Sequence, residues 1–132
     1  MPDMANIVVK MADGTTDITY SKAAASAGDR SPAVWKSETV GTVLAGRPTL
    51  TLTSQDNGTK KSRRLRASFI YPKVRTDAQS QTIVNGGASA EASFLVPQDM
   101  TAAEIGEYAN QFANLLASAL VKSSVTSGYA PT

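Results

Sequence analysis

Apolar and polar residues alternate over much of the first hundred positions of this 132-residue chain. The segment RPTLTLTS, residues 47 to 54, places leucines on one side and threonines on the other. A period of two is typical of an antiparallel strand with one buried face. The alternating positions are Leu50 and Leu52 against Thr49, Thr51 and Thr53.

Further strands follow from the same pattern. ANIVVK and TTDITY flank the turn Asp13-Gly14, which predicts a hairpin over residues 5 to 20 because glycine accepts a positive φ at no steric cost. PAVWKSE, at 32 to 38, and ASAEASFLV, at 88 to 96, have the composition or alternation of strands. The antiparallel sheet is therefore expected over residues 32 to 97.

The segment SQDNGTKKSRRLRASFIYPKV, residues 54 to 74, begins with a turn and continues as a strand with one cationic face. Between residues 55 and 75 there are seven basic residues and one acid, although the whole chain carries only +2. Such an uneven distribution favours binding of a polyanion in one orientation. The polar side carries Arg64, Arg66 and Ser68, and the apolar side Leu65, Ala67, Phe69 and Tyr71.

Two segments complete the pattern. The polar stretch from residue 75 to 87, which ends in Gly86-Gly87, is expected to be a functional or mobile loop because of its length. After Pro97 the period changes to 3.6, and Thr101 and Glu104 form a capping box. One apolar helical stripe follows, made of Ile105, Tyr108, Phe112, Leu115, Leu116, Ala119 and Leu120.

The order of strands and helix predicts a single α+β domain over residues 1 to 132, with C-terminal helix at 101 to 126. One amphipathic helix is too narrow to cover a sheet of five or more strands. A second copy of the chain, lending its own helix, would cover the remaining apolar face.

The composition excludes several kinds of chemistry. The chain has no cysteine and no histidine, so disulfides, thiolate metal sites and histidine-based catalysis are absent. No phosphate-binding glycine motif occurs, and the eleven acids are scattered. No catalytic residue, metal or cofactor is therefore predicted, and an enzyme is the last of the hypotheses. The start lacks a secretory pattern and the longest apolar stretch is too short to span a membrane, so an intracellular protein with no membrane partner is expected.

The basic strand has two interpretations. Charge on an exposed strand commonly prevents edge pairing, and KKSRR resembles a localisation or heparin-type cluster. However, the neighbouring threonines and serines should share the face of Arg64 and Arg66, and such donors suit phosphate and sugar oxygens. Nucleic-acid binding is therefore favoured. Phe69 and Tyr71 lie on the apolar side, so no base-stacking platform is indicated.

The order of these parts resembles the coat proteins of single-stranded RNA bacteriophages of the levivirus type. The resemblance rests on the DG hairpin, AVWKSE, RPTLTLTSQDNGTKKSRRLRASFIYPKV, a loop ending in GG, VPQDMTAAEI, NLLASALVKSS and GYAP. It implies an N-terminal hairpin, a five-stranded antiparallel sheet and two C-terminal helices. It also implies an intertwined homodimer that joins its sheets edge to edge and exchanges helices.

The resemblance further implies a virion protein, assembled in the host bacterial cytoplasm into a T=3 icosahedral shell around genomic single-stranded RNA. The inner sheet face would grip an RNA stem-loop that represses replicase translation, and the loop at 75 to 87 would surround the symmetry axes. The alternative is a small dimeric RNA-binding regulator that forms no shell.

Candidate RNA-binding residues follow from the family's inner face. Serine stands at 68 and at 89 where lysine and tyrosine are familiar, and Glu91 replaces a polar amide. General RNA binding remains the expectation, while a sequence-specific grip stays open. The candidates are Thr49, Thr51, Thr53, Lys61, Arg64, Arg66, Ser68, Ser89 and Glu91.

Overall fold

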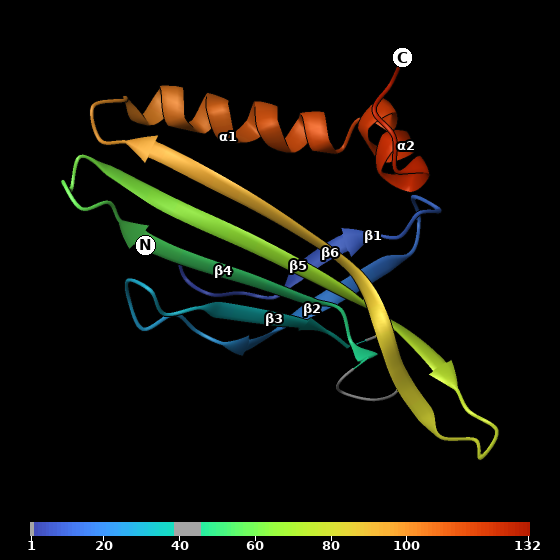
Figure 1. Cartoon of the computed structure of the whole chain (residues 1–132). Coiled ribbons are helices and arrows are strands. Elements are labelled where there is room, and N and C mark those ends of the chain that lie inside the picture. The colour runs from blue at the N-terminus through green and yellow to red at the C-terminus, as the bar shows by residue number, and fades with distance from the viewer. Residues whose placement is uncertain (1, 39–45) are drawn as a thin grey trace. The chain divides into compact units, whose positions relative to one another are not determined.

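The computed structural model of the chain describes residues 2–38 and 46–132 (Figure 1). Part of the predicted sheet region, residues 39 to 45, lies outside the described residues. The chain forms two compact units, Met1–Leu95 and Val96–Thr132, and each is described by itself.

The N-terminal unit is a six-stranded sheet in which the strands follow one another in chain order. The first five strands pair antiparallel with their neighbours, as the alternation predicts. All six strands predicted from the pattern are present. They are β1 (Ile7–Lys10), β2 (Asp17–Ala24), β3 (Ala33–Ser37), β4 (Thr49–Asp56), β5 (Ser62–Thr76) and β6 (Thr82–Pro97).

The N-terminal hairpin is part of this sheet, which differs from the expected separate hairpin over a five-stranded sheet. β2 continues past the predicted end at Tyr20 to Ala24 and pairs with β3, where Tyr20 lies opposite Ser37. A register shift between Lys22 and Ala24 bends this pair of strands. The hairpin and the sheet therefore share one hydrogen-bonded ladder.

The turn between β1 and β2 is held by Asp13. Its carboxylate accepts hydrogen bonds from the amides of Thr15 and Thr16, each at 2.9 Å, and from the Thr16 hydroxyl at 2.5 Å. These bonds, the Thr16 hydroxyl first, lower the pKa of Asp13 from 3.8 to about 2. Gly14 follows with φ +74°, the conformation for which the DG pair was predicted.

We predict that protonating Asp13 weakens this turn. A carboxyl whose pKa is lower in the folded chain stabilises it above the unfolded pKa, and this contribution is lost as the pH falls toward 2. The amide of Asp13→Asn accepts fewer hydrogen bonds and does not titrate, so this variant should lose that part of the acid dependence. Carboxyl titration followed by NMR measures it, and an Asp13 midpoint near 4 would contradict it.

The buried centre of the sheet lies around two aromatic residues. Tyr20 and Trp35 are the large hydrophobic residues that are buried in the described part of the chain. The Trp35 indole donates a hydrogen bond to the Ala5 carbonyl at 2.8 Å, which fixes the segment before β1. The Tyr20 ring packs edge-on against Phe69 at 6.1 Å, and burial raises the pKa of the Tyr20 hydroxyl.

The predicted loop at residues 75 to 87 is wrong, because most of it is strand. β5 continues to Thr76 and β6 begins at Thr82, so only a short turn separates them. Asp77 holds this turn by accepting hydrogen bonds from the amides of Gln79 and Gln81 at 3.0 and 2.8 Å. The β-branched run of Thr82, Ile83 and Val84 extends the strand within a segment that otherwise reads as polar.

Gly86 and Gly87 lie inside β6 rather than at the end of a loop. Both have positive φ, +74° and +148°. A Cβ on Gly87 would lie 2.5 Å from the Tyr71 carbonyl oxygen and 2.7 Å from the Pro72 Cα. The β6 backbone therefore approaches β5 at a point where proline cannot donate a ladder hydrogen bond.

We expect Gly87→Ala to destabilise the chain by roughly 1–3 kcal/mol, because strain and a backbone clash act together. Gly58→Ala is the matched control, since nothing lies within 4 Å of its added Cβ and its φ is not positive. The midpoint of urea unfolding, at one fixed protein concentration, measures both. Equal midpoints for the two variants would show that the β6 backbone does not lie this close to β5 at Gly87.

The C-terminal unit contains two helices, α1 (Ala102–Leu116) and α2 (Ala119–Ser127). The predicted capping box is confirmed, because Thr101 accepts from the Glu104 amide and Glu104 from the Thr101 amide. The apolar stripe is not one helical face, since α1 ends at Leu116 and Ser118 caps α2. No described helix is long and apolar enough to cross a membrane.

Candidate nucleic-acid interface

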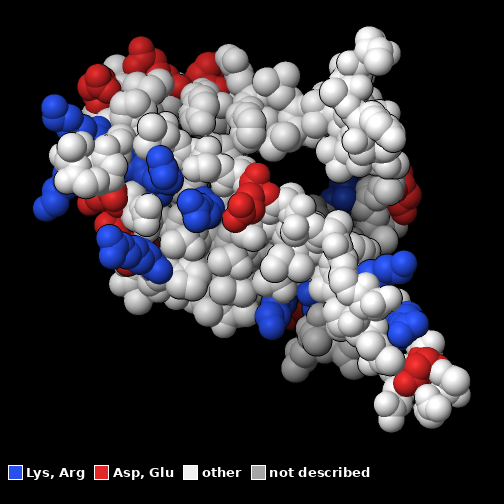
Figure 2. All heavy atoms as spheres, viewed as in Figure 1, with Lys and Arg blue, Asp and Glu red and all other residues white. Residues whose placement is uncertain are grey.

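Charged side chains are spread over the strands. On the face drawn in Figure 2, lysine and arginine form several groups, with aspartate and glutamate among them. Which lysine and arginine side chains can bind an anionic ligand therefore depends on which of them already form ion pairs with neighbouring acids. Among the described residues no cluster of three or more acidic side chains could hold a metal ion.

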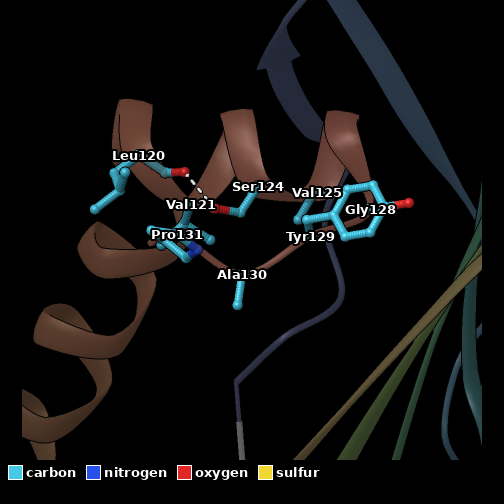
Figure 3. A pocket seen from close by; sticks show the side chains of 8 residues that line it. All are labelled: Leu120, Val121, Ser124, Val125, Gly128, Tyr129, Ala130 and Pro131. Carbon is cyan, nitrogen blue, oxygen red and sulfur yellow. Dashed lines mark hydrogen bonds between the residues drawn. The ribbon is translucent and has the colours of Figure 1, made fainter.

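One surface hollow lies within the C-terminal unit and is almost entirely apolar (Figure 3). Its volume is about 480 Å³. The Ser124 hydroxyl at this hollow already donates to the Leu120 carbonyl at 3.0 Å. The hollow therefore offers little to orient a polar ligand. It is lined by Leu120, Val121, Ser124, Val125, Gly128, Tyr129, Ala130 and Pro131.

A second hollow, of about 110 Å³, lies on the sheet and is lined by polar and charged residues. The antiparallel register explains its composition, because Thr53 lies opposite Arg66 and Gln55 opposite Arg64. Directly paired residues share a sheet face, so two guanidinium groups stand beside a hydroxyl and an amide. These four residues, Thr53, Gln55, Arg64 and Arg66, line the hollow.

The same register continues this polar face along the strands. Thr51 lies opposite Ser68, and Thr49 opposite Ile70. The strand pairing therefore places the threonines on the same face as Arg64, Arg66 and Ser68, as predicted. Leu50 and Leu52 pair with Phe69 and Ala67 on the opposite, apolar face.

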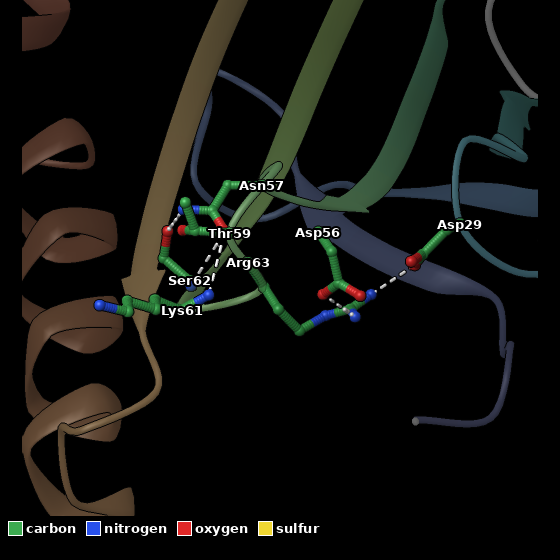
Figure 4. Close-up of polar contacts among 7 residues, drawn as sticks. All are labelled: Asp29, Asp56, Asn57, Thr59, Lys61, Ser62 and Arg63. Atoms are coloured by element: carbon green, nitrogen blue, oxygen red, sulfur yellow. Dashed lines mark hydrogen bonds and ion pairs between the residues drawn. The ribbon is translucent and has the colours of Figure 1, made fainter.

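Arg63 precedes Arg64 on β5, lies on the opposite face of the sheet, and is paired with acids. Its guanidinium donates to Asp29 at 2.5 Å and to Asp56 at 2.6 Å (Figure 4). The hydrogen bond to Asp29, together with both negative charges, raises the pKa of Arg63. One of the seven basic residues counted in the sequence is therefore neutralised, and Arg64 and Arg66 form no ion pair among residues 2–38 and 46–132.

The candidate Lys61 lies in the turn between β4 and β5, outside the hollow. Asn57 organises this turn: its side-chain oxygen accepts from the Lys61 amide at 3.1 Å, and its amide group donates to Ser62 at 2.7 Å. In Figure 4 the Lys61 side chain extends away from Arg63. Lys61 is therefore an exposed cation at the end of the strand.

The candidates Ser89 and Glu91 are exposed on β6, the strand beside β5. Neither lines the polar hollow. Their neighbours Ala92 and Phe94 are partly buried while Glu91 and Ser93 are exposed, which confirms the predicted alternation from Glu91 onward; Ala90, expected on the apolar side, is exposed.

Sequence reasoning missed three residues of this surface. Gln55 was not selected, although its spacing of two from Thr53 is the signal that places it on the polar face. Val34 and Lys36 lie opposite Thr51 and Thr49 and extend this face onto β3. The alternation within AVWKS contains that information, but the segment is too short to show which face is polar.

No family model and no curated protein matches the chain. The solved structures give a different result. The virus-like particle of Beihai levi-like virus 21 superposes with a TM-score of 0.83 at 22% identity, covering 99% of each chain. The chain has the fold of RNA-phage coat proteins.

Two other structures with this coat-protein fold cover the chain equally. The virus-like particle of bacteriophage ESE058 gives a TM-score of 0.80 at 17% identity, and the bacteriophage EMS014 coat protein 0.78 at 18%. In both, 99% of this chain matches 100% of the other. The resemblance predicted from the order of motifs is confirmed at the level of the fold.

Proposed function

We propose that this chain is the coat protein of a single-stranded RNA phage of the levivirus type. Its dimers assemble into a T=3 icosahedral shell around genomic RNA in the cytoplasm of the host bacterium, and the protein then resides in the virion. This proposal rests mainly on the coat-protein fold, which matches 99% of this chain and 99–100% of its structural neighbours. No catalytic step is assigned to it.

Exposed apolar side chains support the dimer. In the described chain only Tyr20 and Trp35 are buried large hydrophobics, and α1 and α2 have no buried residue. Exposed apolar surface of this extent is typical of an interface. Among the described large hydrophobic residues, the most exposed are Tyr129 at 80%, Val125 at 77%, Leu120 at 63% and Leu115 at 62%.

The outer edge of β6 supports edge-to-edge pairing. β6 is 16 residues long and is the last strand of the sheet, so its far side carries unpaired ladder groups. A second copy aligned antiparallel would extend the sheet across a twofold axis. Each copy then lends its helices to cover the apolar face.

The polar face supports RNA binding. Thr49, Thr51, Thr53, Arg64, Arg66 and Ser68 share it, with Lys61 at its end and Ser89 and Glu91 on the neighbouring strand. Hydroxyl and guanidinium donors suit phosphate and sugar oxygens. In the shell this face points to the RNA, and repression of replicase translation through an operator stem-loop is part of the same proposal.

Sedimentation velocity of the chain expressed alone separates this function from a small RNA-binding regulator. Shell assembly predicts a fast, narrow boundary far above that of a dimer, which disassembles to dimers under acid or denaturant. The regulator predicts dimers under every condition. Dimers that bind RNA but never form larger species would overturn the coat-protein proposal in favour of the regulator.

A further inference from the structure

The dipeptide Asn-Gly occurs twice in the chain, at Asn57-Gly58 and at Asn85-Gly86. In this dipeptide the main-chain nitrogen of the glycine can attack the side-chain amide carbon of the asparagine, because glycine has no Cβ that shields the nitrogen. Neither glycine is crowded, since a Cβ on Gly58 or on Gly86 would meet nothing within 4 Å beyond its chain neighbours. A difference in reactivity between the two sites therefore depends on the asparagine.

The side chain of Asn57 is held at both of its polar atoms (Figure 4). Its oxygen accepts hydrogen bonds from the Lys61 amide at 3.1 Å and the Thr59 hydroxyl at 3.2 Å, and its amide group donates to the Ser62 hydroxyl at 2.7 Å. The main chain is fixed as well, because the Asn57 amide donates to the Ser62 carbonyl at 3.1 Å. Asn57 must break several of these bonds before it can form a ring with its own main chain.

The side chain of Asn85 has no such restraint. It is exposed on β6 and forms no hydrogen bond with any residue in the described ranges 2–38 and 46–132. Directly after it, Gly86 has φ +74° and Gly87 has φ +148°, so the extended conformation of the strand is interrupted where the attacking nitrogen lies. The Asn85 amide is therefore free to approach the Gly86 nitrogen.

We propose that Asn85-Gly86 is a site of spontaneous deamidation, and that hydrogen bonding protects the same motif at Asn57-Gly58. The Gly86 nitrogen loses its proton and forms a bond to the Asn85 Cγ, while the bond from Cγ to the side-chain nitrogen breaks and this nitrogen takes up a proton and leaves as ammonia. Water then opens the cyclic imide at either carbonyl, which gives aspartate or isoaspartate at this position. Only water is consumed, so the site is independent of the proposed coat-protein function.

The two products change the pair of strands β5 and β6 in different ways. Aspartate changes only the charge of one exposed side chain. Isoaspartate also inserts a methylene group into the main chain close to Gly87, where even a Cβ would lie 2.5 Å from the Tyr71 carbonyl oxygen. The longer main chain puts the ladder groups of β6 out of step with those of β5. The isoaspartyl form should therefore weaken this hairpin progressively as the protein ages.

Peptide mapping by mass spectrometry, after incubation of the full-length protein in heavy-oxygen water, tests the site. Deamidation during the incubation incorporates the label, which separates it from modification during expression. We expect Asn85 to be labelled about tenfold faster than Asn57 or more, because Asn57 must first break its hydrogen bonds. A ratio near or below one would overturn the proposal. So would an unlabelled Asn85 when a free peptide of residues 82 to 89 is fully labelled.

Two variants test the protection of Asn57. Ser62→Ala removes the acceptor of the Asn57 amide group, and Thr59→Ala removes a donor to the Asn57 oxygen. Each should raise the labelling rate of Asn57 by about threefold or more and leave that of Asn85 unchanged. Thr59 is exposed whereas Ser62 is buried, so Thr59→Ala keeps the test valid if Ser62→Ala does not fold. An unchanged rate at Asn57 in every variant that folds would refute the protection.

Asn85→Gln is the matched control for the effect on the hairpin. It keeps the amide but lengthens the side chain by one methylene group, which disfavours closure of the ring. We expect no label at this position, and a urea unfolding midpoint that stays constant through the incubation while that of wild type falls. Midpoints that fall together in both proteins would show that modification of Asn85 does not weaken the hairpin.

Discussion

Replacing Trp35 with alanine is expected to lower the free energy of unfolding by about 3–5 kcal/mol. Trp35 is only 7% exposed and lies opposite Leu50, on the face that also holds Tyr20. Its removal leaves a cavity and frees the Ala5 carbonyl that the indole now contacts. Because whole domains are stable by ~5–15 kcal/mol, this is the largest single-residue loss expected here. Urea unfolding at fixed protein concentration measures it.

Trp35→Phe separates packing from the hydrogen bond. It keeps most of the ring but loses the donor to Ala5, so we expect a cost of roughly 0.5–1.5 kcal/mol. An equal loss in both variants would assign the stability to the hydrogen bond. A loss below about 1 kcal/mol in Trp35→Ala would show that Trp35 is not the centre of the core.

Leu115→Glu is expected to abolish dimers and shells with little effect on the isolated chain. Leu115 is 62% exposed in the single chain, so a carboxylate there remains hydrated until association covers it. Burying that charge costs several kcal/mol, which is a hundredfold or more in the dissociation constant. Sedimentation at several protein concentrations measures the shift from assembled protein to monomer.

Asn114→Glu is the matched control for this variant. It adds the same charge to the same turn of α1, at an exposed polar position beside the predicted apolar stripe. We expect it to assemble like wild type. If Leu115→Glu also assembles normally, the exposed face of α1 is not the dimer interface. If both variants fail, the added charge itself prevents assembly.

Local patterns predicted most of the fold. Alternation, strand-like composition and the DG turn together located all six strands; alternation is informative because each side of a strand meets a different environment. The DG turn and the capping box were also predictable, since Asp13 and Thr101 act on amides two or three residues away. The segment from 75 to 87 was misread because its polar composition hides a strand whose pairing to β5 is a tertiary feature.

The sequence predicted which residues share the polar face of the sheet. It did not predict which basic side chains already form ion pairs. The register placed Arg64 and Arg66 with the threonines, as alternation indicated. The pairing of Arg63 with Asp29 was not visible, because the two residues are 34 positions apart. Lys36 was missed for the same reason, since only the pairing of β3 with β4 adds it to the face.

One negative-stain electron micrograph of the chain expressed alone, with its absorbance ratio at 260 and 280 nm, tests the central proposal most directly. We expect uniform closed particles whose absorbance ratio shows packaged RNA, and this RNA should resist nuclease until the shell is opened. Protein that stays as dimers free of nucleic acid, with no shells under any assembly condition, would contradict it.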